Sequence, residues 1–182
     1  MPKCDDLSTD LHNAVRSEDI EMVKNMIRDG FDVSELDQGG YIPLHDAAEL
    51  GSLEIVQHLI ENRANINLES SAGSTPLYAA AYHGRDDVAR ELLANGANVD
   101  QSGNGWTPLF IAVLRNNVDV TRQLLIYNAN IHALNSDVGE NWATPLRAAQ
   151  HFARTEIAQL LIDHNDPELS EWDVIDCGAA GK

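Results

Sequence analysis

"TPLYAAAYHG", residues 75–84, decides the fold, because related stretches recur along the chain. The other four copies are TDLHNAVRSE from Thr9, IPLHDAAELG from Ile42, TPLFIAVLRN from Thr107 and TPLRAAQHFA from Thr144. Successive copies start 33, 33, 32 and 37 residues apart. A period of this length indicates one supersecondary unit that is copied along a solenoid.

Each position of the copied unit has a physical role. Threonine supplies an oxygen that caps a helix, and proline fits the first helical position, where its missing N–H costs nothing. The alanines allow helix axes to approach closely, and Gly51 and Gly84 suit the left-handed residue that ends the first helix. A second helix follows, with apolar residues on one face, as at Ile55, Val56, Leu59 and Ile60. An extended loop then leads to the next copy.

The pattern TPL(H/Y)xAAxxG followed by LLxxGAN resembles the ankyrin repeat, and it covers residues 7–164. The resemblance implies an all-α solenoid of five helix-turn-helix units joined by β-hairpin-like loops, with a concave groove on one face. We expect units at 7–40, 41–73, 74–105, 106–142 and 143–164, between an N-terminal segment, 1–6, and an acidic tail, 165–182.

Departures from the pattern are concentrated in the end copies. The first copy has Asp10 for proline and Glu18 for glycine, and the fifth has Arg147 and Ala153 in place of histidine and glycine. These two copies are expected to act as caps with a wetter outer face. Arg63 replaces the glycine that ends a second helix, which costs about 1 kcal/mol if its φ is positive.

Two segments have no counterpart in the other copies. The loop from His132 to Ala143 carries four extra residues, which predicts a longer finger. The tail contains Leu169, Trp172 and Val174 among several acidic residues. It either folds over the last helix pair as a cap or is a flexible docking peptide.

Composition limits the classes of partner. The net charge of −17 repels phosphate backbones and anionic lipid, so we expect neither nucleic acid nor membrane as a partner. A neutral or basic protein is the expected partner of a monomeric chain. Cys4 and Cys177 have no companion at metal-ligand spacing, and the N-terminus has no apolar signal core. These features predict a cytoplasmic location that can extend to the nucleus.

Catalytic and metal-binding patterns are not found in the sequence. His12 and His45 occupy a slot in which the resemblance implies a hydrogen bond from the ring to loop backbone. The remaining histidines form no HExxH motif, no Cys/His cluster and no Ser/His/Asp arrangement. We therefore expect no catalytic residue, no metal and no cofactor, and we expect that the protein is not an enzyme.

The resemblance implies that the position before Thr-Pro-Leu and the two positions after the Ala-Ala pair face the groove. We call the residues in these positions the contact stripe. Exposed aromatic and apolar side chains in a row mark an interface, and tyrosine, tryptophan and arginine carry much of the binding energy. The alternative for Trp106 and Trp142 is structural filling between adjacent loops. The contact stripe consists of Tyr41, Glu49, Leu50, Tyr82, His83, Trp106, Leu114, Arg115, Trp142, His151 and Phe152.

The main functional prediction is a non-enzymatic scaffold that binds a protein through this groove. One alternative is a small regulatory inhibitor, similar to ankyrin proteins that block cyclin-dependent kinases by binding alone. Another is an adaptor for a ubiquitin ligase or an effector. A third is a substrate: Asn67, with Leu59 eight residues earlier, resembles the loop asparagine that asparaginyl hydroxylases modify in this family.

Overall fold

The computed structural model describes residues 7–103, 105–135 and 143–165 of the chain. Ten α-helices lie within these ranges, and they form five pairs that we number as repeats 1 to 5. The pairs are α1 (Leu7–Arg16) and α2 (Ile20–Arg28), α3 (Pro43–Leu50) and α4 (Leu53–Glu61), α5 (Pro76–His83) and α6 (Asp86–Ala94), α7 (Pro108–Arg115) and α8 (Val118–Ile126), and α9 (Pro145–His151) and α10 (Thr155–Asn165). The predicted all-α solenoid is confirmed.

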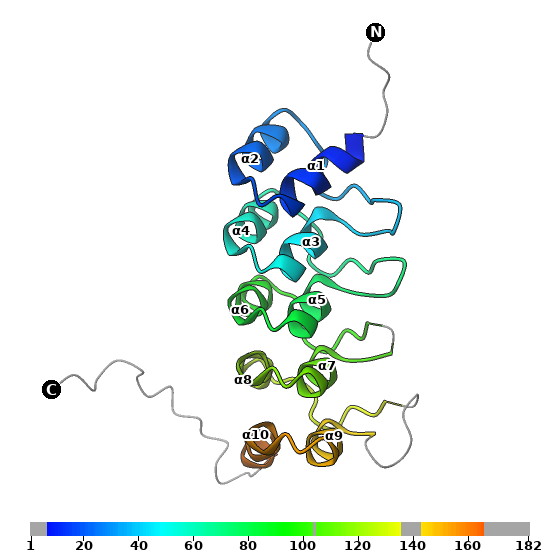
Figure 1. Cartoon of the computed structure of the whole chain (residues 1–182), viewed down its shortest axis with the longest axis vertical. Coiled ribbons are helices and arrows are strands. Elements are labelled where there is room, and N and C mark those ends of the chain that lie inside the picture. The colour runs from blue at the N-terminus through cyan, green and yellow to red at the C-terminus, as the bar shows by residue number, and fades with distance from the viewer. Residues whose placement is uncertain (1–6, 104, 136–142, 166–182) are drawn as a thin grey trace, which may run out of the picture.

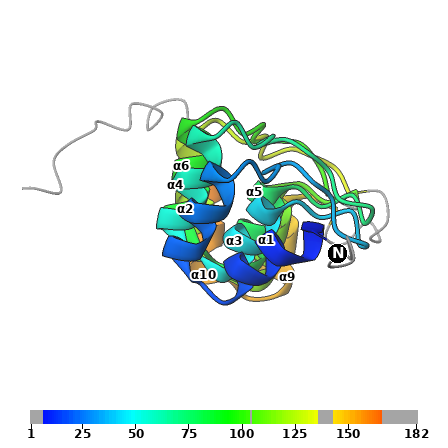
Figure 2. The same ribbon diagram turned by 90° about the horizontal axis from the view of Figure 1, so that it is seen from above.

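The helices form two parallel columns. Figure 1 shows the first helices of the pairs stacked in one column and the second helices in the other, with repeat 1 at the top and repeat 5 at the bottom. The main contacts join α3 to α5, α5 to α7 and α7 to α9 in one column, and α4 to α6 and α6 to α8 in the other. Seen from above, the loops between repeats lie over one another at one side of the columns (Figure 2). Each repeat therefore packs mainly against its neighbours.

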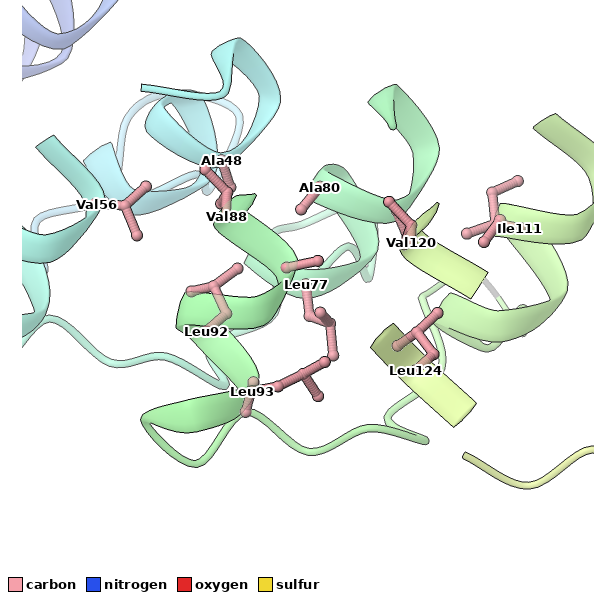
Figure 3. Close-up of a cluster of buried hydrophobic side chains, with 14 of the residues drawn as sticks. Ala48, Val56, Leu77, Ala80, Val88, Leu92, Leu93, Ile111, Val120 and Leu124 are labelled. Atoms are coloured by element: carbon pink, nitrogen blue, oxygen red, sulfur yellow. The ribbon is translucent and has the colours of Figure 1, made fainter. Parts of the chain in front are cut away.

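Small side chains hold the first column together. Ala47, Ala48, Ala80 and Ala81 are all fully buried, which lets α3 and α5 approach closely. Larger apolar residues fill the space toward the second column, and Figure 3 shows part of this cluster, including Leu77, Leu92 and Leu124. The core is thus one continuous layer that runs through the whole stack.

Most first helices start as the sequence predicts. The Oγ1 atoms of Thr75 and Thr107 accept hydrogen bonds from backbone N–H groups three residues later, at 3.1 and 3.2 Å, and proline follows each threonine. Ile42 has no such oxygen. Its N–H donates to His45 Nδ1 (3.2 Å), while His45 Nε2 donates to the Ser74 carbonyl (2.8 Å). The predicted bond from the His45 ring to loop backbone is confirmed, and it links repeats 2 and 3.

His12 differs from this expectation. Its Nδ1 lies 2.5 Å from Asp46 Oδ2 of repeat 2, a carboxylate in place of loop backbone. The cause is the missing proline: α1 begins at Leu7 and runs through Thr9. A helical Thr9 does not have the extended conformation that turns an N-cap N–H toward the side chain three residues later. The His12 ring contacts Asp46 instead, which ties repeat 1 to repeat 2.

The loops between repeats are fingers closed by backbone hydrogen bonds. Asp37 N–H donates to the Tyr41 carbonyl (2.8 Å), and Ser70 N–H donates to the Ser74 carbonyl (2.9 Å). Gly103 and Trp106 exchange two such bonds, which form an isolated antiparallel bridge. In the last finger Asn135 N–H donates to the Ala143 carbonyl (2.9 Å), and the predicted longer tip, 136–142, lies outside the described residues. The fingers are hairpin-like without extended strands in the described ranges.

Residues other than glycine adopt the left-handed backbone conformation at several helix ends. Arg63 has φ +70°, and it stands at the slot where Gly30 and Gly96 have φ +97° and +92°. The condition for the strain expected at Arg63, a positive φ, is therefore met. Glu18 and Ala153, at the ends of α1 and α9, have φ +55° and +54°. The end repeats therefore carry strain that glycine relieves at Gly51 and Gly84.

Arg63→Gly should raise the free energy of unfolding by about 0.5–1 kcal/mol, because glycine adopts positive φ without strain. The reverse change, Gly96→Ala, should lower it by a similar amount. An added Cβ at Gly96 meets nothing within 4 Å, so this variant tests backbone conformation alone. Urea unfolding followed by circular dichroism measures both changes. A loss of stability in Arg63→Gly would contradict the interpretation.

Two groups, the half-buried Asp37 and the buried His45, make stability depend on pH. Asp37 Oδ1 accepts hydrogen bonds from the N–H groups of Gly39 (2.8 Å) and Tyr41 (2.9 Å), and Oδ2 accepts one from Arg16 (3.0 Å). Burial acts to raise the pKa of Asp37, but these donors outweigh it, so the pKa lies below its ordinary value. Burial lowers the pKa of His45, whose ring is neutral in its two hydrogen bonds.

Both shifts make the folded state less stable in acid. The unfolded chain binds a proton at histidine below about pH 6.5, where His45 in the folded chain still resists protonation, so stability falls as the pH decreases from that value. The contribution of Asp37 is present above about pH 4 and is lost as the pH falls through its lowered pKa. His45→Gln should flatten the loss between pH 7 and 5, and Asp37→Asn should flatten only the loss below pH 4. Urea unfolding at several pH values gives the free energy of unfolding of each variant as a function of pH. If either variant loses stability with falling pH as steeply as the wild type in its stated range, the interpretation is contradicted.

Candidate functional site

The finger bases place two aromatic residues of the contact stripe beside the first helices. Tyr41 and Trp106 are both half-buried. The Tyr41 ring meets the His45 ring edge-on at 5.5 Å between centroids, and the Trp106 ring meets Phe110 in the same way at 5.2 Å. Trp106 also packs against the core. Each ring therefore rests on the residue four positions later and keeps part of its surface at the finger base.

Tyr82 lies at the centre of the stripe, at the C-terminal end of α5. It is half-buried and packs against the core. The guanidinium carbon of Arg115, one repeat further along, lies 4.3 Å from the centroid of the Tyr82 ring. This distance is in the range of a cation–π interaction. The Tyr82 ring thus forms part of a surface that repeats 3 and 4 share.

Repeats 2 and 3 meet in the stripe through a contact between a carboxylate and an imidazole ring. Glu49 Oε1 lies 3.5 Å from His83 Nε2, and both residues are exposed. Leu50, which follows Glu49 at the end of α3, is half-buried. The structure therefore places Glu49 beside His83 and Tyr82 beside Arg115, so that residues from repeats 2, 3 and 4 are neighbours.

The stripe becomes more apolar toward repeat 5. Leu114 at the end of α7 is half-buried against the core. His151 and Phe152 at the end of α9 are exposed, and their rings meet edge-on at 4.8 Å. Phe152 has 39% of its surface exposed, which is high for a phenylalanine. Trp142 lies outside the described residues.

Three polar residues that were not predicted from the sequence form hydrogen bonds between neighbouring first helices next to the stripe. Each follows the left-handed residue that ends a first helix, and each reaches a carbonyl of the preceding first helix. Arg85 Nε donates to the Glu49 carbonyl (2.9 Å), Asn117 Nδ2 donates to the Ala81 carbonyl (2.6 Å), and Arg154 Nη2 donates to the Leu114 carbonyl (3.5 Å). These bonds satisfy helix ends and fix the spacing between neighbouring stripe residues. The sequence does show that a polar side chain recurs at this position of repeats 3, 4 and 5, and this recurrence could have predicted the bonds.

In repeats 3 to 5, carboxylates lie on the second helices and not on the first helices. The first helices of repeats 3, 4 and 5 contain no aspartate or glutamate, although the chain has 29 acidic residues. They carry Arg115 and Arg147 instead, both exposed, together with His83 and His151. The second helices all have acidic residues in their first turns, namely Glu21, Glu54, Asp86, Asp87, Asp119 and Glu156. The stripe of repeats 3 to 5 is therefore neutral to cationic in a strongly acidic protein.

Asn67 has a structural use in the second finger. Its Oδ1 accepts a hydrogen bond from Asn98 N–H (2.8 Å), and its Nδ2 donates to the Gly96 carbonyl (3.1 Å). Both ends of the amide thus connect repeat 2 to the loop of repeat 3. An enzyme that modified this side chain would have to break these bonds first, so hydroxylation at Asn67 stays a prediction.

Two other kinds of site, a metal centre and a membrane-spanning helix, do not occur in the described residues. Histidine, cysteine and acidic side chains there do not form groups of three or more that could hold a metal ion. No helix in those ranges has both the length and the apolar character needed to cross a membrane.

Comparison with known proteins agrees with this architecture. A family model for ankyrin repeats matches the chain in three overlapping copies, at residues 11–102, 62–135 and 95–173. No curated protein matches the chain. Ankyrin repeats are generally protein–protein interaction modules, and the family is typically non-enzymatic. With nearly the whole repeat region matched, the chain belongs to the ankyrin repeat family.

Proposed function

We propose that this protein is a non-enzymatic scaffold that binds a protein partner along the contact stripe, with the strongest contacts at repeats 3 to 5. One observation carries the proposal: Tyr82, Arg115 and Phe152 are at least partly exposed at the C-terminal ends of first helices that lack carboxylates. Aromatic and arginine side chains of this kind dominate binding energy in protein interfaces. The contacts of Glu49 with His83 and of Tyr82 with Arg115 join repeats 2, 3 and 4, which supports one continuous surface.

The partner's chemistry follows from the charges. Because the chain carries −17, a partner that is neutral or basic overall is favoured at long range. At short range the partner presents apolar groups to Tyr82 and Phe152 and a carboxylate to Arg115. Acidic residues of the second helices are screened over about 8 Å at physiological salt, so they do not prevent this local contact. We place the interaction in the cytoplasm or nucleus, with the scaffold acting as a monomer.

Tyr82→Ala should weaken binding of the partner by about 30-fold or more, because a central aromatic anchor contributes on the order of 2 kcal/mol. Tyr127→Ala is the matched control, since Tyr127 is a 37% exposed tyrosine at the end of α8, in the second column. Affinity capture with the wild-type chain identifies the partner, and calorimetry with the purified partner then measures each variant. Equal affinity of the two variants, with intact helical spectra, would reject this surface.

Arg115→Glu should reduce affinity by about 10-fold or more, because it reverses the charge that faces the partner's carboxylate and removes the cation over Tyr82. Arg122→Glu provides the control: Arg122 lies on α8 and pairs with Glu156 at 3.6 Å. Binding at low and high salt shows whether the effect is electrostatic. If the Arg122 variant lost as much affinity as the Arg115 variant, overall charge would explain binding better than the stripe does.

The finer role within this class depends on what else the chain recruits. A regulatory inhibitor needs only the stripe, whereas an adaptor for a ubiquitin ligase or an effector needs a second binding element. Deleting residues 166–182 and comparing the captured proteins separates these roles. Loss of one captured protein with retention of the stripe's partner would favour the adaptor.

A further inference from the structure

The end of the stack at repeat 5 leaves apolar surface open that repeats 3 and 4 bury. Ile162 on α10 is 45% exposed, whereas Leu93 and Leu125, in the same slot of α6 and α8, are 4% and 5% exposed. Ala158 is partly exposed, although its counterparts Ala89 and Thr121 are fully buried. In repeats 3 and 4, the following helix pair covers these slots, whereas Ile60 in the Ile162 slot of repeat 2 is half-buried.

The first helix of repeat 5 shows the same pattern. Leu146 is partly exposed, whereas Leu77 and Leu109 in its slot are buried. Gln150 is exposed, whereas Ala81 and Val113 at the same position of repeats 3 and 4 are fully buried. This position of repeat 5 therefore holds a polar residue that water can solvate. Leu146, Ala158 and Ile162, in contrast, are apolar residues at partly exposed positions. We call these three residues the end face.

The chain itself continues from the border of the end face. α10 ends at Asn165, three residues after Ile162, and residues 166–182 follow. This segment contains Leu169, Trp172, Val174 and Ile175. At about 3.3 Å per residue, the four residues from Asn165 to Leu169 span roughly 13 Å, which exceeds the distance of 8–10 Å between packed helices. The ankyrin family match also continues past α10, to residue 173.

We propose that residues 166–182 cover the end face, with Trp172 packed against Ile162. The segment would then act as the cap that repeat 5 lacks, because terminal repeats of a solenoid require protection of their outer surface. This assignment concerns the end of the stack and is independent of the contact stripe. A second copy of the chain on the end face is the competing occupant.

A double-mutant cycle in the full chain tests the assignment. Ile162→Ala and Trp172→Ala are made singly and together, and urea unfolding gives the equilibrium constant of each variant. Contacting residues should be coupled by about three-fold or more in this constant. Ile126→Ala with Trp172→Ala is the control cycle, because Ile126 is 64% exposed at the end of α8, away from the end face. The control cycle should be additive within about two-fold.

Two further measurements keep the outcomes distinct. Deleting residues 166–182 should lower the melting temperature by about 2–6 °C and speed hydrogen exchange in α10. Sedimentation of the full chain should give one species that does not depend on concentration. Additivity in both cycles, unchanged exchange in α10, or a dimer that Ile162→Ala dissociates would each overturn the proposal.

Discussion

Burial between neighbouring repeats is the constraint on which the rest of the structure depends. A helix pair of about twenty residues cannot cover its own apolar face, and each repeat here uses the next repeat for that purpose. The fully buried alanines Ala48 and Ala81 set the close spacing of the first helices. Since that spacing is small and regular, side chains at the helix ends lie near their counterparts in the next repeat. The contact stripe is therefore a consequence of the packing, and any change that separates two repeats would also separate stripe residues.

Polar contacts fix the position of each repeat relative to the next. Arg85, Asn117 and Arg154 each bind a carbonyl of the preceding first helix, and the Asn67 amide joins two loops. Each of these bonds crosses a repeat boundary. Where the first repeat lacks its helix-starting proline, the contact between His12 and Asp46 supplies a boundary bond of a different kind. The stack is thus held by apolar burial along its length and by at least one hydrogen bond or ion pair at each boundary.

The fold could be predicted from the sequence because each of its signals is local. Threonine, proline and glycine act within one helix turn, so the caps at Thr75 and Thr107 and the left-handed ends at Gly51 and Gly84 followed from position alone. Contacts across repeats were harder to predict. The partners of His12 and Arg85 depend on how two repeats are placed in space, which no single repeat specifies. The charge segregation was visible in the sequence, but it gains meaning only once the two columns are known. The stripe itself stays a prediction.

The account of function requires that Tyr82 and Phe152 become covered when the partner binds, while the second column stays open to water. Hydroxyl-radical footprinting with mass spectrometry reports the exposure of individual aromatic side chains. In the complex we expect oxidation of Tyr82 and Phe152 to fall well below that in the free chain, with oxidation of Tyr127 unchanged. Protection of Tyr127, with Tyr82 and Phe152 oxidised as in the free chain, would contradict the assignment of the binding surface.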